Sequence, residues 1–380
     1  MIPFNRPHFT GQELRWIKDV FESGQTAGNF NFTKRCQAFF EHRYDMRKAL
    51  LTTSCTDALE LASLLCEVEP GDEVILASYG FVSTANAFAL RGASLVFADS
   101  QPDHPNVSLE SLETLITPRT RVIALTHYAG VAVDMDPLLA LAAPQGIRVV
   151  EDAAQGVEAF YRQRSLGTMG DLGTLSFHET KNIQCGEGGM LIVNDPAFVN
   201  RAEIVWEKGT NRASFFRGEV DKYSWVDLGS SYAPSEIMGA VLWAQLENLE
   251  AIQARRMDRW TQFMDRLNPL ETDGLAILPR IPEYAKHNAH IFYLVTRDLG
   301  ERSRLIEHLK GRGIHAVFHY QSLHKSPYFT SKHRGHDLPN ANRFSDCLVR
   351  LPLWPDLMPG QVDHICDEVL RFYGFPSSGS

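Results

Sequence analysis

The sequence predicts an α/β fold in which a large domain is followed by a smaller one. In the first half of the 380-residue chain, short apolar runs alternate with segments of helix length, a pattern typical of βαβ units and a mainly parallel sheet. Near Ala233 the pattern changes to a long amphipathic stretch. A single core rarely grows to this chain length, so we expect a large domain over residues 1–247 and a small domain over residues 248–375. Residues 376–380 have the composition of a linker and are expected to be disordered.

Six strands are expected in the first half of the chain. The runs EVILA, SLVFA, RVIALTH and IRVVE end at Ala77, Ala98, His127 and Glu151. Turn-forming residues precede the first and the last of these runs, as Pro-Gly-Asp and Pro-Gln-Gly. The runs GTLSF and GMLIV lie on either side of residues 178–188 and are the remaining two strands.

The second half predicts one long helix and then a smaller α/β unit. Residues 234–267 have helical periodicity and contain no proline after Pro234, so we expect a single helix that links the two domains. Beyond it, the run AHIFYLV predicts a strand, RSRLIEHLKGRG a helix, IHAVFHY a strand and PGQVDHICDEVLRFY a helix.

The composition excludes several classes of function. The net charge is -9 and charged residues make up 22% of the chain, which argues against the basic face that a nucleic-acid-binding protein needs. The six cysteines form no CxxC pair, as expected of reduced thiols. We find no signal peptide and no apolar run of the roughly 18–20 residues that cross a bilayer. The sequence therefore predicts a cytoplasmic enzyme that acts at no membrane.

A carboxylate and an amide follow a buried strand in the string VVEDAAQG. In α/β sheets, ligands bind beyond the carboxyl ends of the strands, and Asp152 and Gln155 fall at such an end. Asp152 either caps the helix that follows it or faces a cationic ligand. Its position alone leaves both interpretations open.

Lys181 lies between two expected strands, in the string LSFHETKN, and a glycine-rich stretch follows it. A lone lysine is usually a solvated surface charge, but less surface is expected between two strands. A lysine amine that is removed from water by burial loses its proton more easily and becomes a nucleophile toward carbonyl groups. Lys181 is therefore a candidate nucleophile.

Small polar residues precede a helical pattern in the string LLTTSCTDALELASLL. The free N–H groups of a helix N-terminus, together with the hydroxyl groups of Thr53, Ser54 and Thr56, form a ready anion site, although an ordinary helix cap has the same pattern. The chain has no Walker A motif and no GxGxxG after a strand, so nucleoside triphosphates and dinucleotides are weak candidates as ligands.

Three histidines, His315, His319 and His324, occur in the string IHAVFHYQSLH. His315 and His319 would share a face of the expected strand, but no HExxH motif accompanies them. Such clusters in enzymes are more often polar pocket residues than metal ligands, so we expect no metal.

Taken together, these segments resemble the DegT–DnrJ–StrS family of sugar aminotransferases, which have fold type I of the pyridoxal-phosphate enzymes. The resemblance extends from IPFNRP near the start to LPLWPDLMPGQ near the end, and the strings SFHETKN, EKGTNRASFFRGEVDKYSW and DLGSSY carry most of it. It implies a large domain with a mainly parallel seven-stranded sheet and a smaller C-terminal α/β domain. It also implies pyridoxal 5′-phosphate as the cofactor, with pyridoxamine 5′-phosphate as its intermediate form.

The resemblance gives each matching position a role. Lys181 would form the Schiff base with the cofactor and carry the proton to and from the substrate carbon. Asp152 would keep the pyridine nitrogen protonated so that the ring acts as an electron sink, and Gln155 would bind the ring oxygen O3′. Phe81 would stack on the ring, although an aromatic residue after a strand often only packs in the core.

The phosphate of the cofactor would be held by the start of the helix. Ser54, Cys55 and Thr56 occupy the matching positions, and Ser176 would add a hydroxyl group. The family often has glycine at the position of Cys55. A neighbouring subunit normally contributes an asparagine to the phosphate, but here Ser231 stands at that position, so this contact is expected to be shorter.

The resemblance further implies a homodimer whose subunits share each active site. A loop of one subunit would approach the nucleotide sugar bound to its partner, through Arg212, Phe216, Arg217 and Lys222. Arginine suits a diphosphate because of its planar fork of donors; the alternative is that these charges only solvate the loop. His319, Tyr320 and His324 are expected to line the site, without a chemical step of their own.

The implied reaction moves an amino group from L-glutamate to C4 of TDP-4-keto-6-deoxy-D-glucose and gives a TDP-4-amino-4,6-dideoxyhexose and 2-oxoglutarate. The configuration at C4, galacto or gluco, stays open. One rival is a sugar dehydratase of the same fold, in which histidine replaces the Schiff-base lysine; the chain has both His178 and Lys181, and Lys181 is at the anchoring position. The other rival is a regulator that binds the cofactor without turnover, against which the complete set of Asp152, Gln155 and Lys181 argues.

Overall fold

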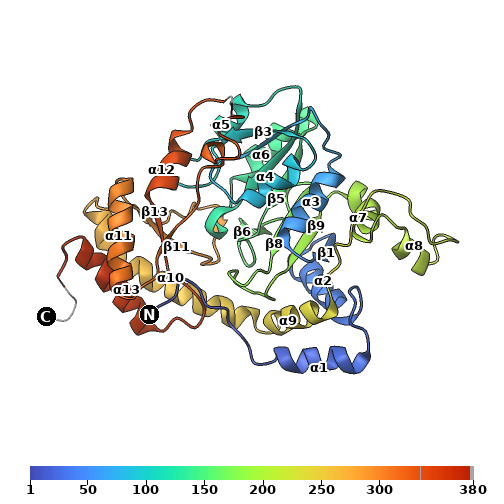
Figure 1. Cartoon of the computed structure of the whole chain (residues 1–380), viewed down its shortest axis with the longest axis horizontal. Helices are drawn as coiled ribbons and strands as arrows, with labels where there is room; N and C mark the ends of the chain where they lie inside the picture. Colours follow the sequence, from blue (N-terminus) through green and yellow to red (C-terminus); the bar gives the residue numbers. More distant parts are fainter. Residues whose placement is uncertain (334, 377–380) are drawn as a thin grey trace.

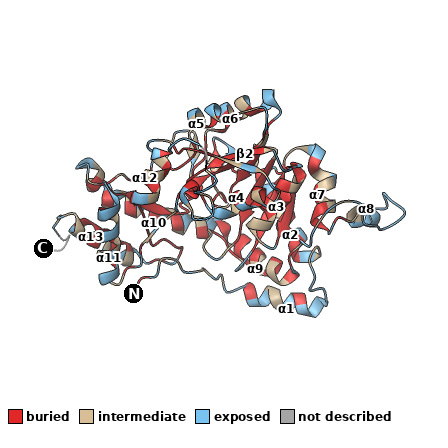
Figure 2. Ribbon diagram, turned by 45° about the horizontal axis from the view of Figure 1, so that its top comes forward, coloured by how far each residue is buried: buried red, intermediate tan, exposed pale blue. Residues whose placement is uncertain are grey.

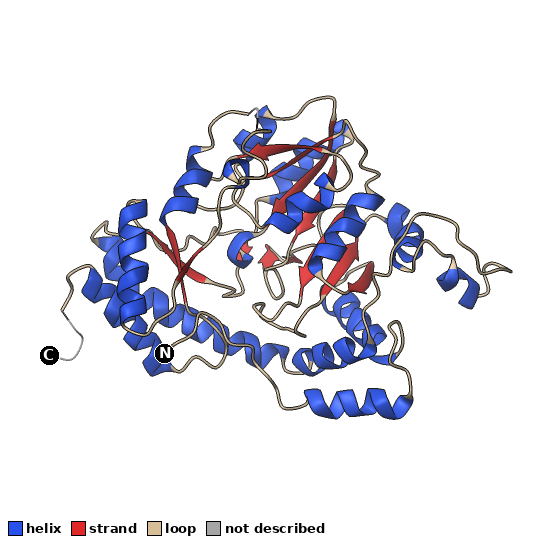
Figure 3. Ribbon diagram, in the orientation of Figure 1, coloured by secondary structure: helices blue, strands red, loops and turns tan. Residues whose placement is uncertain are grey.

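A seven-stranded sheet forms the centre of the computed structural model, which describes residues 1–333 and 335–376 (Figures 1 and 3). Its strand order is β1-β9-β8-β5-β4-β2-β3. Strand β9 runs antiparallel to both of its neighbours, and all other pairs are parallel. The predicted fold class is thereby confirmed. The strands are β1 (Lys48–Thr52), β2 (Glu73–Ala77), β3 (Ser94–Ala98), β4 (Thr120–Thr126), β5 (Arg148–Asp152), β8 (Leu172–Ser176) and β9 (Gly189–Val193).

The strands at the centre of this sheet are largely apolar because both faces are covered. In β2, Val74 and Leu76 belong to one core cluster, while Ile75 and Ala77 belong to the other. Figure 2 shows this buried sheet between layers of helices. A parallel sheet that is buried on both faces needs such continuous apolar runs. Residues of α3 (Cys55–Leu65), α4 (Val82–Ala89) and α7 (Val199–Trp206) belong to the first cluster, and residues of α2 (Asn31–Tyr44), α6 (Met135–Ala142) and α9 (Glu236–Leu246) belong to the second.

All six strands expected in the first half are present, and β2, β3 and β9 match the expected runs residue for residue. Strand β1 has no counterpart among the predicted strands, because only three of its five residues are apolar. The remaining α-helices of this half are α1 (Glu13–Ser23), α5 (Leu109–Thr114) and α8 (Arg212–Phe216), and its short strands are β6 (Phe160–Tyr161) and β7 (Arg164–Ser165).

The predicted single helix over residues 234–267 is wrong, because the structure has two helices there, α9 and α10 (Leu249–Thr272). At the break, the Asn248 side chain donates a hydrogen bond to the carbonyl group of Ala244, 3.0 Å away. Asparagine competes in this way with the hydrogen bonds of the helix backbone. The break falls at the predicted domain boundary, residues 247 and 248, although the division into two domains stays a prediction.

The C-terminal part is built on a three-stranded antiparallel sheet in the order β11-β13-β12. Helix α10 runs beneath it in Figure 1, and α11, α12 and α13 lie beside it. The strand expected over residues 314–320 shrinks to two residues, so His315 and His319 lie outside it and do not share a strand face. Residues 377–380 of the expected tail lie outside the described residues. The elements are β10 (Ala285–Lys286), β11 (Phe292–Val295), β12 (Val317–Phe318), β13 (Leu348–Leu351), α11 (Leu299–Gly311), α12 (Pro339–Cys347) and α13 (Pro359–Phe372).

The buried carboxylate of Glu151 fixes the carboxyl end of β5. It accepts hydrogen bonds from the backbone N–H groups of Gly167, Met169 and Gly170 at 2.6–2.9 Å. It also lies 2.9 Å from His127 Nε2. The Val133 N–H donates to His127 Nδ1, so Nε2 carries the proton and donates to Glu151. One carboxylate therefore connects the ends of β4 and β5 and the turn that precedes β8.

We expect Glu151→Gln to lower the free energy of unfolding by about 2–4 kcal/mol, because an amide N–H₂ would face buried N–H donors and leave them unpaired. Urea unfolding followed by circular dichroism measures this change. Glu250→Gln is the matched control, because its side chain is 84% exposed and should change stability by no more than about 0.5 kcal/mol. Equal effects of the two substitutions would contradict the role of Glu151.

Candidate active site

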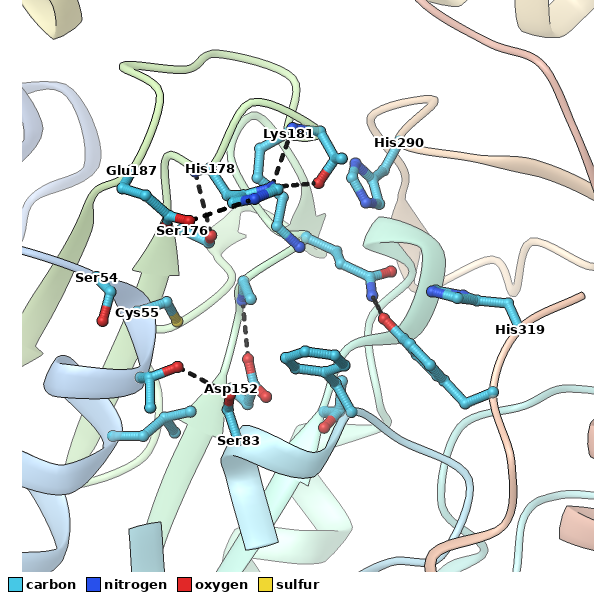
Figure 4. Close-up of a pocket in the computed structure, with 18 of the residues that line it drawn as sticks. Ser54, Cys55, Ser83, Asp152, Ser176, His178, Lys181, Glu187, His290 and His319 are labelled. Atoms are coloured by element: carbon cyan, nitrogen blue, oxygen red, sulfur yellow. Dashed lines mark hydrogen bonds and ion pairs between the residues drawn. The ribbon is translucent and has the colours of Figure 1, made fainter. Parts of the chain in front are cut away.

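A cavity of about 500 Å³ opens at the carboxyl edge of the sheet (Figure 4). The last residues of three neighbouring parallel strands line it: Thr126 of β4, Asp152 of β5 and Ser176 of β8. This volume suits a small ligand or cofactor. The cavity brings together residues that the sequence places far apart, namely Ser54, Cys55, Thr56, Phe81, Asp152, Gln155, Ser176, Lys181, His319 and Tyr320.

Lys181 lies in the turn between β8 and β9, and its backbone N–H donates to the carbonyl group of His178 at 2.9 Å. Its side chain lines the cavity and forms no ion pair with any residue in the described ranges. Burial lowers the pKa of the Lys181 amine, and the charge of Arg350 lowers it further, against the opposing effects of Cys55 and Asp152. A lowered pKa leaves more of the amine neutral and therefore nucleophilic.

Asp152 is 4% exposed and is held by two donors. The Thr84 hydroxyl group donates to Oδ2, and the Ala154 backbone N–H donates to Oδ1 at 3.1 Å. Because successive strand residues face opposite sides, Asp152 and Glu151 point in opposite directions. Asp152 thus lines the cavity while Glu151 fixes the strand end. The Asp152 carboxylate has further lone pairs that can accept a hydrogen bond from a ligand.

Gln155 and Phe81 line the cavity on the same side as Tyr320. Gln155 Oε1 accepts a hydrogen bond from the Ala129 backbone N–H at 2.7 Å. The Nε2 atom of Gln155 is therefore the donor, and this atom lies 3.4 Å from the Tyr320 hydroxyl group. Phe81 is 52% exposed, with its ring centroid 5.8 Å from that of Tyr320. The alternative that Phe81 only packs in the core is wrong, since its ring faces open space.

The N-terminus of α3 forms another wall of the cavity. The Ser54 hydroxyl group caps the helix by accepting the Asp57 N–H at 3.0 Å, and the Thr56 hydroxyl group lies 2.8 Å from that of Ser83. A Cβ atom on Gly189 would fall 2.3 Å from the Cys55 nitrogen, so only glycine lets β9 pass so close. Burial raises the pKa of the Cys55 thiol to about 12, which keeps it neutral. The segment is therefore both a capped helix and a cavity wall with free N–H groups.

Two further cavity residues, His290 and Arg350, have no counterpart among the predicted site residues. Asn182 Nδ2 donates to the Asn288 carbonyl group at 2.8 Å, which leaves its Oδ1 to accept from His290 Nδ1 at 2.9 Å. His290 Nε2 is consequently an acceptor. Arg350 interrupts the apolar string LVRLPLW, and this isolated charge is the signal by which it could have been found.

The residues predicted to contact a partner's substrate lie outside this cavity. Arg212, Phe216 and Arg217 line a second cavity of about 650 Å³, next to α2. Arg217 forms ion pairs of 2.8 Å with Glu203 and 2.7 Å with Glu219. Lys222 and Ser231 line neither cavity, and Ser231 forms a β-bridge with Glu207.

His324 also lies outside the active-site cavity, which corrects the expectation that it lines the site. Its Nδ1 atom is 2.6 Å from the Ser78 hydroxyl group, and the residue is buried. Within the described ranges, no group of three or more His, Cys, Asp or Glu residues is placed to hold a metal ion. In the same ranges, no helix has the length and apolar character needed to cross a bilayer.

The groups that surround the main cavity fit pyridoxal phosphate. Lys181 offers an amine to the cofactor's aldehyde, and Asp152 offers a carboxylate to its ring nitrogen. Phe81 offers a flat apolar face to the ring, and the start of α3 offers N–H and hydroxyl groups to the phosphate. Asp152 is held by Thr84 and Ala154, and the Ser54 side chain caps the start of α3.

Comparisons with known proteins agree with this assignment. A model of the DegT/DnrJ/EryC1/StrS aminotransferase family matches residues 8–370. The aminotransferase TlmJ from Streptoalloteichus hindustanus is 28% identical, with a TM-score of 0.90 over 98% of this chain and 99% of its own. DesV from S. venezuelae is 29% identical, with a TM-score of 0.88 over 99% of both chains.

A third structure has a similar fold. Spr1654 from Streptococcus pneumoniae, described as a putative sugar aminotransferase, is 24% identical and has been solved in its PLP form with a TM-score of 0.89 over 98% of both chains. From the family match over most of its length, the chain belongs to the DegT/DnrJ/EryC1/StrS family of pyridoxal-phosphate-dependent aminotransferases, with fold type I.

Proposed function

We propose that the chain is a nucleotide-sugar aminotransferase that moves the amino group of L-glutamate to C4 of TDP-4-keto-6-deoxy-D-glucose. The products are a TDP-4-amino-4,6-dideoxyhexose and 2-oxoglutarate. The observation that carries the proposal is the position of Lys181, which places a reactive amine in one cavity with the buried carboxylate of Asp152. A dehydratase of this fold would have histidine in place of this lysine, so the geometry favours transamination.

The choice of a sugar substrate rests on the resemblance of three strings. SFHETKN, EKGTNRASFFRGEVDKYSW and DLGSSY resemble the transaminase that makes TDP-4-amino-4,6-dideoxygalactose. The description of Spr1654 as a putative sugar aminotransferase points to the same substrate class. The donor L-glutamate is likewise proposed from the resemblance.

When bound, pyridoxal phosphate supplies an aldehyde and an electron-withdrawing ring. Lys181 would hold the cofactor covalently at rest, and its neutral amine would afterwards carry the proton to and from the reacting carbon. Asp152 would favour the protonated ring nitrogen, with a carboxylate that two hydrogen bonds keep in place. Gln155 Nε2 would donate to the ring oxygen, because Gln155 Oε1 already accepts a hydrogen bond from the Ala129 N–H group.

The start of α3 would hold the phosphate of the cofactor. The N–H groups of Cys55 and Thr56 and the hydroxyl groups of Ser54 and Ser176 line this end of the cavity. The positive end of the helix dipole favours an anion here. Because the helix fixes these donors, they would hold the phosphate in one place.

The segment of residues 207–232 fits a role in a homodimer. It includes α8 and extends away from the body of the molecule at the right of Figures 1 and 2. It exposes large apolar side chains, including Phe216 at 73% and Trp225 at 79%. We propose that a second copy covers this surface, and that Ser231, Arg212 and Lys222 reach the partner's active site.

Arg212 and Arg217 differ in their freedom to bind a diphosphate. Arg217 is paired with two glutamates, whereas Arg212 has one long ion pair of 3.9 Å with Glu207 and lies over the Phe216 ring. Arg212 is therefore the stronger candidate for the nucleotide sugar.

All six cysteines are free thiols, which fits the proposed cytoplasmic location.

The lowered pKa of Lys181 predicts its reactivity in the apoprotein. Only the neutral amine reacts with acetic anhydride, so Lys181 should reach half of its maximal labelling at a lower pH than the exposed Lys18, measured by trace labelling and peptide mass spectrometry. Lys181→Ala should also remove the absorbance band of the lysine-bound cofactor and reduce turnover by about 10²–10⁴-fold. A labelling profile like that of Lys18, or an unchanged absorbance band, would refute the assignment.

The reaction itself predicts a defined product. Purified enzyme with pyridoxal phosphate, L-glutamate and TDP-4-keto-6-deoxy-D-glucose should form equal amounts of 2-oxoglutarate and an amino sugar. Proton NMR of the product checks the position of the amine, and the coupling of H4 distinguishes an axial from an equatorial amine. Loss of the sugar's oxygen without amination would indicate the dehydratase, and no 2-oxoglutarate under any of these conditions would indicate a regulator.

The loop assignment predicts that Arg212→Ala raises the KM for the nucleotide sugar by about 5- to 30-fold, as expected for one lost charge-assisted contact. The KM for glutamate should change less than about 2-fold by the same reasoning. Arg217→Ala is the comparison variant and should have a smaller effect, because Glu203 and Glu219 already hold its guanidinium. An equal effect of Arg212→Ala on both substrates would count against the loop assignment.

A further inference from the structure

His290 is a buried residue of the active-site cavity that stands outside the set of groups that fit the cofactor. It is 4% exposed and lines the cavity together with Lys181. The His290 N–H group donates to Asn288 Oδ1 at 3.0 Å, and Arg256 donates to the His290 carbonyl group at 2.6 Å. Both partners are themselves buried, so the backbone that carries the imidazole ring is fixed on two sides.

The two ring nitrogens of His290 differ in their partners. Nδ1 lies 2.9 Å from Asn182 Oδ1. The Asn182 amide is oriented by the Asn288 carbonyl group and by Gln253 Oε1, which accept from its Nδ2 at 2.8 Å and 3.1 Å. Asn182 Oδ1 is therefore an acceptor, so His290 Nδ1 carries the proton and Nε2 carries a lone pair. Among residues 1–333 and 335–376, this Nε2 atom has no hydrogen-bond partner.

The His290 ring is neutral at ordinary pH. Burial lowers the pKa of His290 well below its usual value. The basic groups around the ring lower this pKa further, namely Lys181, Arg350, Arg256 and His319. A neutral imidazole with an unused lone pair accepts a hydrogen bond from a donor and offers nothing to an anion. His290 therefore presents one fixed acceptor to the cavity.

The amine of Lys181 needs such an acceptor whenever it carries a proton. It lines the cavity and forms no ion pair with the residues that the structure describes. A buried ammonium group without a partner is unfavourable. A carboxylate in direct contact would hold the proton firmly, which does not suit a group that must release it again. A neutral acceptor stabilises the ammonium form to a smaller extent.

The chain brings the lysine and the imidazole together. Lys181 and Asn182 are consecutive residues, and Asn182 Oδ1 holds the His290 ring at 2.9 Å. Figure 4 shows the Lys181 and His290 side chains on the same side of the cavity. We propose that His290 Nε2 accepts a hydrogen bond from the free Lys181 amine and positions this amine for proton transfer in both halves of the reaction.

His290 is a positioning residue in this role, because it acts through Lys181. No proton moves to the imidazole: the hydrogen bond forms when the amine leaves the cofactor and breaks when the amine returns to it. The inference rests on the proposed role of Lys181 as the carrier of the proton. The alternative donor to Nε2 is a hydroxyl or amino group of one substrate, in which case loss of His290 would weaken the binding of that substrate alone.

Two substitutions separate the functions of the two ring nitrogens. His290→Asn keeps a donor near the position of Nδ1, next to Asn182, but has no acceptor at the position of Nε2. His290→Gln has the converse arrangement, with its Oε1 near the position of Nε2 and no donor to Asn182. His287→Asn is the control, because His287 lies in the same segment, accepts the Ala289 N–H on Nδ1 at 3.1 Å and does not line the cavity.

The first measurement is trace acetylation of Lys181 in the full-length apoprotein over a series of pH values. Loss of an acceptor that favours the ammonium form lowers the pKa of the amine, so His290→Asn should reach half-maximal labelling about 1 pH unit below the unchanged protein. His290→Gln should have a midpoint between the two, and His287→Asn should match the unchanged protein. A midpoint in His290→Asn that is unchanged or higher would overturn the inference.

The second measurement follows single turnovers of the holoenzyme, with L-glutamate in one arm and the keto sugar in the other. His290→Asn should slow both arms by about 10- to 100-fold, while the substrate concentration for half-maximal rate changes less than about 3-fold. The ratio of the rates with ordinary and α-deuterated glutamate should not fall, because proton transfer is the step that slows. A smaller ratio, or a loss confined to one arm, would contradict the role of His290.

Thermal unfolding and the cofactor absorbance band identify a variant that is misfolded. If His290→Asn is misfolded, His290→Gln takes its place, and its labelling midpoint must still lie below that of the unchanged protein. If the unchanged enzyme does not react with glutamate, the proposed donor fails. The labelling midpoint of the apoprotein requires no substrate, so it decides the role of His290 independently of the donor.

Discussion

The active site depends on how the carboxyl end of β5 is fixed. A strand end would ordinarily be free to move, but the buried carboxylate of Glu151 holds three backbone N–H groups and the ring of His127. Because side chains alternate along a strand, this anchor on one side sets the position of Asp152 on the other. Two adjacent acidic residues thus have different roles. The hydrogen bonds of Glu151 are all made within the protein, whereas Asp152 has lone pairs left for a ligand.

The amine of Lys181 depends on a balance of burial and charge. Burial alone would favour its neutral form, while Asp152 and Cys55 favour the protonated form. The Cys55 thiol is itself kept neutral by burial, so its opposing influence is limited at ordinary pH. The result is an amine that is available as a nucleophile and can still accept a proton, as a group that carries a proton in both directions requires.

The sequence predicts the sheet well because its physical signal is local. Strands β2, β3 and β9 are continuous apolar runs between turn residues, and the residues at their carboxyl ends follow directly. The break at Asn248 was not predictable from periodicity, because one side-chain hydrogen bond to Ala244 decides it. Arg350 and His290 were missed for a different reason: about 200 and 140 residues of chain lie between them and Asp152, and only the tertiary fold brings them to one cavity. The contacts across a subunit boundary depend on a second chain and stay a prediction.

The distribution of charge in the cavity differs from that of the whole chain. The protein has a net charge of -9, which would repel anionic substrates if it were spread evenly. Arg350 is a buried cationic group in the cavity wall, Lys181 is a basic group whose pKa burial lowers, and the carboxylate of Asp152 already accepts two hydrogen bonds. A low-dielectric wall strengthens the local field relative to distant surface charges, which salt screens. The groups that line the cavity, and not the net charge of the chain, therefore decide which charges a ligand meets once it has entered.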